Sequence, residues 1–311
     1  MNENEYTSPT FSRQRLQSLL PLLSLLLLLT TACCKKEEPV NNGRKQKLSF
    51  DCSSGSQTDA IREIEVFVFD DQERLLGRTS TQVEGTIVLD YPQTSVLHCI
   101  AWGNSKDSGL EFSPLKLGDS LEEGYLTLKT LLPVRAGETF SNMPPDLFWG
   151  AIQIDNTSMP DDRQPLQMVM LPTTASIHIT IDGLPDATGT ESGDYSVVVG
   201  EPAGRIDFSG SYGGKTRHCL TGTFDTGNDY IIPVFRLFPA VGGEGIGIEV
   251  FHGGELLKSI TQTSSGKPII PVPGKELTLL IKFDTPPSFD GNLEIKPPEW
   301  DTTDVTVSVT K

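Results

Sequence analysis

The chain has 311 residues and a formal net charge of −16 at pH 7. A surface this acidic repels nucleic acid and anionic lipid headgroups, so partners of those two kinds are excluded. The 41 acidic residues are dispersed rather than gathered into the long blocks typical of disordered tails, so the charge is interpreted as solvation of a folded surface.

The first predicted element is an export signal. An apolar run of about eleven residues, Leu19–Leu29, is preceded by two arginines and followed by small residues. It is too short to span a bilayer and is typical of a cleaved signal peptide, here residues 1–32. A cysteine in the next position is the acylation site of a bacterial lipoprotein, and Cys33 fits that position better than Cys34. The alternative is an ordinary secretory signal, whereas acylation with two or more chains would hold the protein stably in a membrane.

Residues 33–46 are predicted to be the acylated cysteine and a flexible tether, because this stretch is polar and has no apolar periodicity. The triplet Lys36-Glu37-Glu38 resembles the short signal that sends Bacteroidetes lipoproteins to the cell surface. The expected location is therefore the outer membrane, with the chain lipid-anchored and exposed at the cell surface.

After the tether the hydrophobic pattern has a period of two almost throughout, which predicts an all-β protein. The length suits two β-sandwich domains, at residues 47–171 and 172–311, with the boundary in Leu171–Thr174. The first set of strands is predicted at Lys47–Cys52, Ile64–Phe69, Thr86–Leu89, Val96–Trp102, Leu147–Ile154 and Leu166–Met170. The second set is predicted at Ala175–Ile181, Tyr195–Val199, Arg205–Phe208, His218–Phe224, Tyr230–Phe238, Ile246–Phe251, Leu256–Gln262, Leu277–Phe283 and Val305–Val309.

Three local patterns add detail. The isoleucines of Ala175–Ile181 alternate with polar residues, as on a strand with one buried side. His252-Gly253-Gly254 predicts the turn of a hairpin. Ser120-Leu121-Glu122-Glu123 has the pattern of a capping box and predicts one short helix running toward Leu132.

Cysteine usage is sparse, since only four cysteines follow Cys33, too few for a disulfide scaffold. Cys52 and Cys99 are a candidate disulfide if their strands are neighbours in the first domain. An unpaired buried thiol is the alternative for each of them.

The sequence offers few candidates for metal ligands or catalytic residues. His98-Cys99 and His218-Cys219 resemble metal ligands, but adjacent residues of a strand point to opposite faces, so neither pair can close on one ion. Paired acids such as Asp70-Asp71 and Glu122-Glu123 are interpreted as solvated turn residues rather than as the two carboxylates of a glycosidase. No nucleophile elbow, Cys-x-x-Cys pair or zinc-protease helix occurs. We therefore expect a structural or binding role, with no enzyme activity, metal, cofactor or small-molecule substrate.

The C-terminal segment alternates valines with small polar residues. Val305, Val307 and Val309 mark it as a candidate donor strand. Such a strand pairs either within its own domain or with another chain, as in strand donation between pilus subunits.

Four segments together resemble the FimB-like lipoprotein anchor subunits of fimbriae in Bacteroides- and Porphyromonas-type bacteria. They are Ile64–Asp70, Ala101–Asn104, Pro145–Gly150 and Ser176–Leu184, and the resemblance covers most of the mature chain. It implies two tandem transthyretin-like β-sandwich domains. It also implies a non-enzymatic subunit that attaches a fimbria to the outer membrane at its base and limits its length, with a fimbrillin stalk subunit as partner.

The alternative function is a surface lipoprotein adhesin that binds glycan or a host protein. A glycan binder needs exposed aromatic residues as a platform. Trp102, Trp149 and Trp300 lie in or beside apolar runs, where core packing is expected instead.

Overall fold

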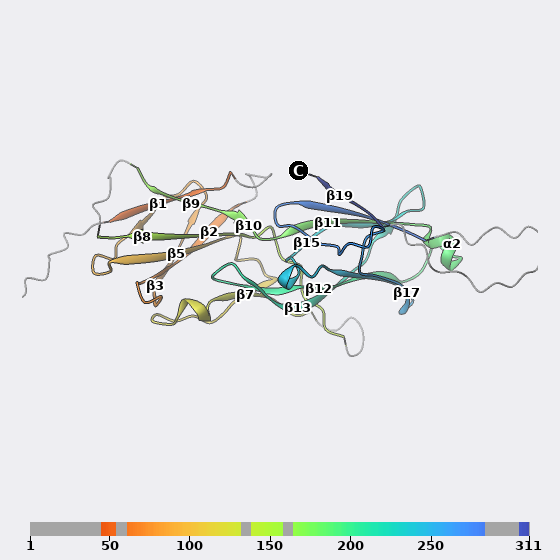
Figure 1. Ribbon diagram of the computed structural model, residues 1–311, viewed down its shortest axis with the longest axis horizontal. Helices are drawn as coiled ribbons and strands as arrows, with labels where there is room; N and C mark the ends of the chain where they lie inside the picture. Colours follow the sequence, from red (N-terminus) through yellow and green to blue (C-terminus); the bar gives the residue numbers. More distant parts are fainter. Residues whose placement is uncertain (1–44, 54–60, 132–137, 158–163, 284–304, 311) are drawn as a thin grey trace, which may run out of the picture. The chain divides into compact units, whose positions relative to one another are not determined.

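The computed structural model describes residues 45–53, 61–131, 138–157, 164–283 and 305–310, the last of these as backbone only. It confirms the all-β prediction, because strands make up nearly all the regular structure and the α-helical part is a single five-residue helix within these ranges (Figure 1). No helix among the described residues is long and apolar enough to cross a membrane.

The first half of the chain forms a sandwich of two sheets. One sheet has the strand order β4-β1-β9 and the other the order β10-β8-β5-β2-β3. Leu48 of β1 and Met168 of β9 share a core with Val66 of β2 and Leu97 of β5, so the two sheets face each other across it. The elements are β1 (Gln46–Asp51), β2 (Glu63–Phe69), β3 (Leu75–Gln82), β4 (Ile87–Leu89), β5 (Val96–Gly103), β6 (Leu110–Phe112), η2 (Leu121–Glu123), β7 (Tyr125–Leu128), β8 (Phe148–Asp155), β9 (Leu166–Val169) and β10 (Leu171–Pro172).

The second half is a sandwich of the same kind. Its sheets have the orders β14-β15-β11-β18-β19 and β17-β16-β12-β7-β6, with β13 paired to β12. Ile179 of β11 and Leu279 of β18 meet Val197 of β12 and Ile248 of β16 in the second core. The elements are β11 (Ala175–Asp182), α2 (Leu184–Thr188), β12 (Tyr195–Asp207), β13 (Tyr212–Leu220), β14 (Thr223–Phe224), β15 (Tyr230–Leu237), η3 (Val241–Gly243), β16 (Gly247–His252), β17 (Glu255–Ile260), β18 (Glu276–Lys282) and β19 (Val305–Thr310).

The two halves share one sheet, because β12 is long enough to serve both. It has 13 residues, and its last part, Arg205–Asp207, pairs antiparallel with β7 of the first half. The sequence predicted two separate strands here. A bulge between Gly200 and Ala203, with Glu201 at a φ of 73°, joins them into one. The boundary at residues 171–174 stays a prediction, and the hydrogen-bonded sheet crosses it.

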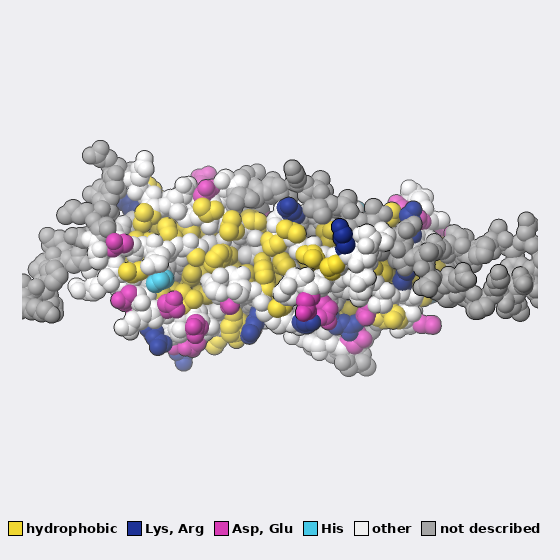
Figure 2. All heavy atoms as spheres, in the orientation of Figure 1, with side chains coloured by type: hydrophobic (Ala, Val, Ile, Leu, Met, Phe, Trp, Pro, Cys, Tyr) yellow, Lys and Arg dark blue, Asp and Glu magenta, His cyan; other side chains and the backbone are white. Residues whose placement is uncertain are grey.

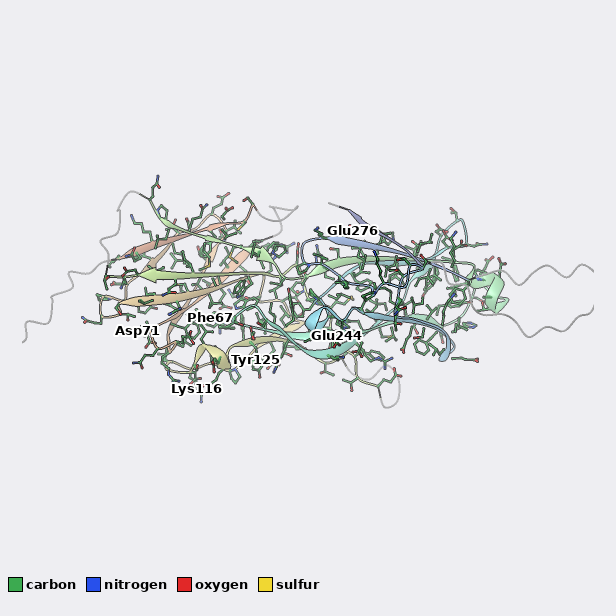
Figure 3. The ribbon with its side chains drawn as sticks, in the orientation of Figure 1. Phe67, Asp71, Lys116, Tyr125, Glu244 and Glu276 are labelled. Atoms are coloured by element: carbon green, nitrogen blue, oxygen red, sulfur yellow. The ribbon has the colours of Figure 1, made fainter. Side chains whose placement is uncertain are left out.

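A third core lies where the halves meet. Phe208, which follows β12, is fully buried, and its ring centroid lies 4.7 Å from that of Phe67 and 5.9 Å from that of Trp102. Phe67, labelled in Figure 3, lies on β2 of the first half. A Cβ at Gly124 would lie 2.5 Å from Phe208 Cγ, so only glycine fits there. The predicted core packing of Trp102 is confirmed, since it is 0% exposed.

The helix predicted from Ser120 toward Leu132 is wrong. The Glu123 side chain does accept the Ser120 backbone N–H, at 3.4 Å, but this capping interaction closes only one 3-10 turn. The chain then enters β7, whose Leu126 and Leu128 are buried in the third core. Burial of these two alternating side chains outweighs the local helix signal.

The hairpin turn predicted at His252-Gly253-Gly254 is confirmed. β16 and β17 pair antiparallel with His252 opposite Glu255, and both glycines have positive φ, 57° and 88°. This is the backbone that a two-residue hairpin loop requires.

Candidate functional site

The C-terminal strand is the outermost strand of its sheet. β19 pairs antiparallel with β18, and β18 pairs in parallel with β11. The register sets the three valines of Val305–Val309 opposite Ile281, Leu279 and Leu277, whose side chains are no more than 3% exposed. The candidate donor residues therefore occupy register positions beside buried residues of the second core. In this structure β19 pairs within its own chain, and its donation to another chain stays a prediction.

The start of β18 is tied to the segment that joins the two halves. The backbone N–H of Gly274 donates to the Thr174 carbonyl at 2.8 Å, and that of Ser176 donates to the Lys275 carbonyl at 3.0 Å. A Cβ at Gly274 would lie 2.6 Å from Pro172 Cγ, so the two segments touch directly. β18, which pairs with β19 and begins at Glu276 (Figure 3), is thus held close to the link between the sandwiches.

At the other end of the fold, β1 is the first described strand. It pairs antiparallel with β4 and in parallel with β9, and Leu48 holds it in the first core with no exposed surface. Lys45 Nζ lies 3.0 Å from Asp90 Oδ2, but both side chains are at least half exposed, so the pair contributes less than about 1 kcal/mol. The predicted acylation site, Cys33, and its alternative, Cys34, lie outside the described residues.

The candidate disulfide between Cys52 and Cys99 is not formed. Cys52 follows β1 and Cys99 lies on β5, so their strands belong to opposite sheets of the sandwich and are not neighbours. Both thiols are free, although both pack in the first core. Burial raises the pKa of Cys99 to about 12, and burial together with the charge of Asp51 raises that of Cys52. Both side chains are therefore protonated, weakly reactive thiols at neutral pH.

Side-chain contacts that the sequence did not indicate join the halves beside the shared sheet. Trp149 Nε1 donates to the Phe208 carbonyl at 3.2 Å, and the Tyr212 hydroxyl donates to the Thr173 carbonyl at 2.8 Å. Burial raises the pKa of Tyr212 to about 12, which keeps this donor protonated. A further contact is the ion pair of Arg236 with Asp146, 3.3 Å apart. No short motif marks these residues, because each partner is distant in sequence.

His218 of β13 is 1% exposed and lies against Ser141 of the first half. Its Nδ1 is 3.0 Å from the Ser141 carbonyl, while its Nε2 has no hydrogen-bond partner. Desolvation lowers the pKa of His218, and the Ser141 carbonyl opposes that shift in part. The ring is therefore neutral at pH 7 and donates from Nδ1. This is a structural histidine.

The acidic groups weighed for catalysis also have structural roles. Asp70 Oδ1 accepts the backbone N–H groups of Gln72 and Arg74, at 2.9 and 2.8 Å, which confirms it as a turn residue. Within the described ranges, no group of three or more His, Cys, Asp and Glu side chains is arranged to hold a metal ion. On the face seen in Figure 2, acidic side chains are scattered with Lys and Arg among them.

Solved structures that share this fold include a fimbrial anchor protein and a putative adhesin. The fimbrial anchor protein Mfa2 from Porphyromonas gingivalis matches with a TM-score of 0.58 at 14% identity, over 86% of this chain and 97% of that one. A putative adhesin from Bacteroides ovatus matches with a TM-score of 0.58 at 12% identity, over 77% and 89%. At these identities the likeness defines the class of fold alone, a β-sandwich protein.

The sequence relationship is narrower. The major fimbrium anchoring subunit FimB of Porphyromonas gingivalis is 26% identical over 238 residues, which cover 73% of this chain and 75% of FimB. The family model described as Fimbrillin-A associated anchor proteins Mfa1 and Mfa2 matches residues 39–306. The chain therefore belongs to this family of fimbrial anchor proteins, and the resemblance to FimB-like anchors is confirmed.

Proposed function

We propose that this chain is the base subunit of a fimbria, acylated at Cys33, that attaches the fibre to the outer membrane at the cell surface and limits its length. It acts without catalysis, and a fimbrillin stalk subunit is its partner. Membership of the anchor family supports the role. The proposed contact with the partner rests on β19. This edge strand pairs with β18 on one side, and the valines of β19 occupy register positions beside buried residues.

The adhesin alternative has less support. Among the described residues, every strongly exposed large apolar side chain is aliphatic or methionine, so this part of the surface lacks the aromatic platform on which sugars stack. These residues are Val88, Leu117, Leu131, Met143, Leu166, Val169, Leu171, Val234, Leu256, Ile270 and Val272.

The lipid is tested by electron microscopy of cells that carry Cys33→Ala, beside the matched variant Cys34→Ala and the parent strain. Attached and shed fimbriae are counted and their lengths measured. Cys33→Ala should shed fibres, whereas Cys34→Ala should keep them. Fibres of normal length that stay attached in Cys33→Ala would refute the proposal. Shedding in Cys34→Ala alone would show that Cys34 is the acylated residue.

The partner contact is tested by locking β19 in place. Val307 and Leu279 are register partners, and opposite residues of a sheet lie close enough for a disulfide. Val307→Cys combined with Leu279→Cys should therefore hold β19 on its own sheet. If β19 is donated to the stalk, the locked chain loses its fimbriae, while Val307→Cys alone and Leu279→Cys alone retain them. Normal fimbriae on the locked chain would show that β19 is not the contact.

A further inference from the structure

The strand pair at the N-terminal end of the fold is parallel, and this decides how it is loaded by a pulling force. β1 and β9 pair through four register positions, from Leu48 with Leu166 to Asp51 with Val169. The chain enters β1 at its N-terminal end and leaves β9 at its C-terminal end, toward β10 and β11. In a parallel pair these two points lie at opposite ends.

A force between those points acts along the strands. The hydrogen bonds of all four register pairs are then stretched together, in shear. A force applied at the same end of both strands would instead open the pairs one after another. Because forced rupture is governed by the rate of unfolding, a pair that must break all its bonds at once ruptures at a higher force.

Other contacts hold β1 against this sliding motion. Leu48 and Met168 are no more than 1% exposed, and a slip of one residue would turn such side chains toward the solvent face. Ser49 Oγ donates to the Leu166 carbonyl at 3.2 Å, and the Met170 N–H donates to the Asp51 carbonyl at 2.8 Å. β4 adds three antiparallel register pairs on the other side of β1.

The same polarity recurs in the second half. β11 and β18 pair in parallel through seven register positions, from Ser176 with Glu276 to Asp182 with Lys282. The chain enters β11 at its N-terminal end from the first half and leaves β18 at its C-terminal end toward β19. Tension from the first half to the chain beyond β18 therefore loads this pair in shear as well.

We propose that β1·β9 and β11·β18 are two force-bearing clamps in series, which resist tension between the membrane end and the fibre end of the chain. The inference rests on the proposed function, because an anchor is pulled between those two ends. β1·β9 has four register pairs against seven, so it yields first.

Single-molecule force spectroscopy on the chain from residue 34 onward tests the first clamp. One handle is fixed at the N-terminus, and an azide-bearing residue provides the second handle at either of two exposed positions. Glu191, beyond β11, pulls the C-terminal end of β9 and loads the pair in shear. Gln164, just before β9, pulls the end that lies beside the start of β1 and opens the pairs in turn. With either handle, rupture of the β1·β9 pair releases the chain between these two strands. The two placements therefore differ in the direction in which they load the pair.

At equal loading rate the first rupture force should be roughly two- to fourfold higher with the handle at Glu191, because four register pairs are loaded together. Equal forces, or a higher force with the handle at Gln164, would overturn the proposal. The measurement needs no fimbria, so it fails independently of the anchor role. Equal forces combined with fibre shedding in Cys33→Ala would remove the clamps and leave the anchor. Unequal forces combined with retained fibres would refute the anchor and keep the mechanical asymmetry.

Discussion

The third core should make Phe208 a residue on which both halves depend. Its ring is fully buried, with centroids 4.7–6.2 Å from those of four aromatic rings in the first half, Phe67, Phe69, Trp102 and Phe112. Replacing a buried phenylalanine with alanine costs roughly 3–5 kcal/mol, and most where the cavity cannot collapse. The substitution also removes edge-to-face ring packing, which supports the upper part of that range. We therefore expect Phe208→Ala to lower the free energy of unfolding by about 4 kcal/mol.

Guanidinium unfolding of the chain from residue 34 onward, followed by tryptophan fluorescence, measures this change, with Trp102 as a reporter inside the affected core. Both halves should unfold in one transition, and the variant should shift it as a whole. Val234→Ala, at a side chain 55% exposed, is the control and should change the free energy by less than about 0.5 kcal/mol. A loss below about 1.5 kcal/mol, or two transitions of which one stays in place, would refute the reasoning.

Three further predictions concern a buried histidine, a buried thiol and an ion pair. The pKa of His218 is lowered in the folded chain, so the unfolded chain binds the proton more readily. The free energy of unfolding should therefore fall as the pH drops below the ordinary pKa of 6.5. His218→Gln should lose that part of the pH dependence, which unfolding experiments at pH 7 and pH 5 measure. Cys99 should resist alkylation at pH 8 until the chain is denatured, and mass spectrometry without reductant would expose a bridge to Cys52 if neither thiol then reacted. A double-mutant cycle of Arg236→Met and Asp146→Asn should give a coupling of no more than about 1 kcal/mol that shrinks with salt, since both side chains keep contact with solvent; a larger, salt-independent coupling would contradict this.

The strands with one buried side could be predicted because burial of alternate residues leaves a period of two in the sequence. The burial of β11 alternates along Ala175–Ile181 as that pattern predicts. β3 escaped prediction because most of its side chains are at least partly exposed on an edge, so its sequence carries little apolar alternation. The same local reasoning indicated that the C-terminal segment is a strand, and β19 confirms the strand itself.

Local sequence patterns do not specify which element a strand packs against. The sequence at Arg205–Phe208 indicates a strand, but nothing in it specifies β7 as the neighbour or the first half as the place where Phe208 packs. The candidate disulfide failed for the same reason, because period and spacing do not say which sheet of a sandwich holds each cysteine. The contacts of Trp149 and Tyr212 likewise depend on partners about 40 to 60 positions away.

The shared strand limits how this protein can be divided or recombined. A fragment that ends near residue 171 would leave Phe67 and Trp102 without Phe208 above them, and a fragment that begins there would present Arg205–Asp207 without β7. The two sandwiches are thus not interchangeable modules. An exchange of halves between members of this family would have to include a matched β7 and β12. The two sandwiches therefore form a single structural unit.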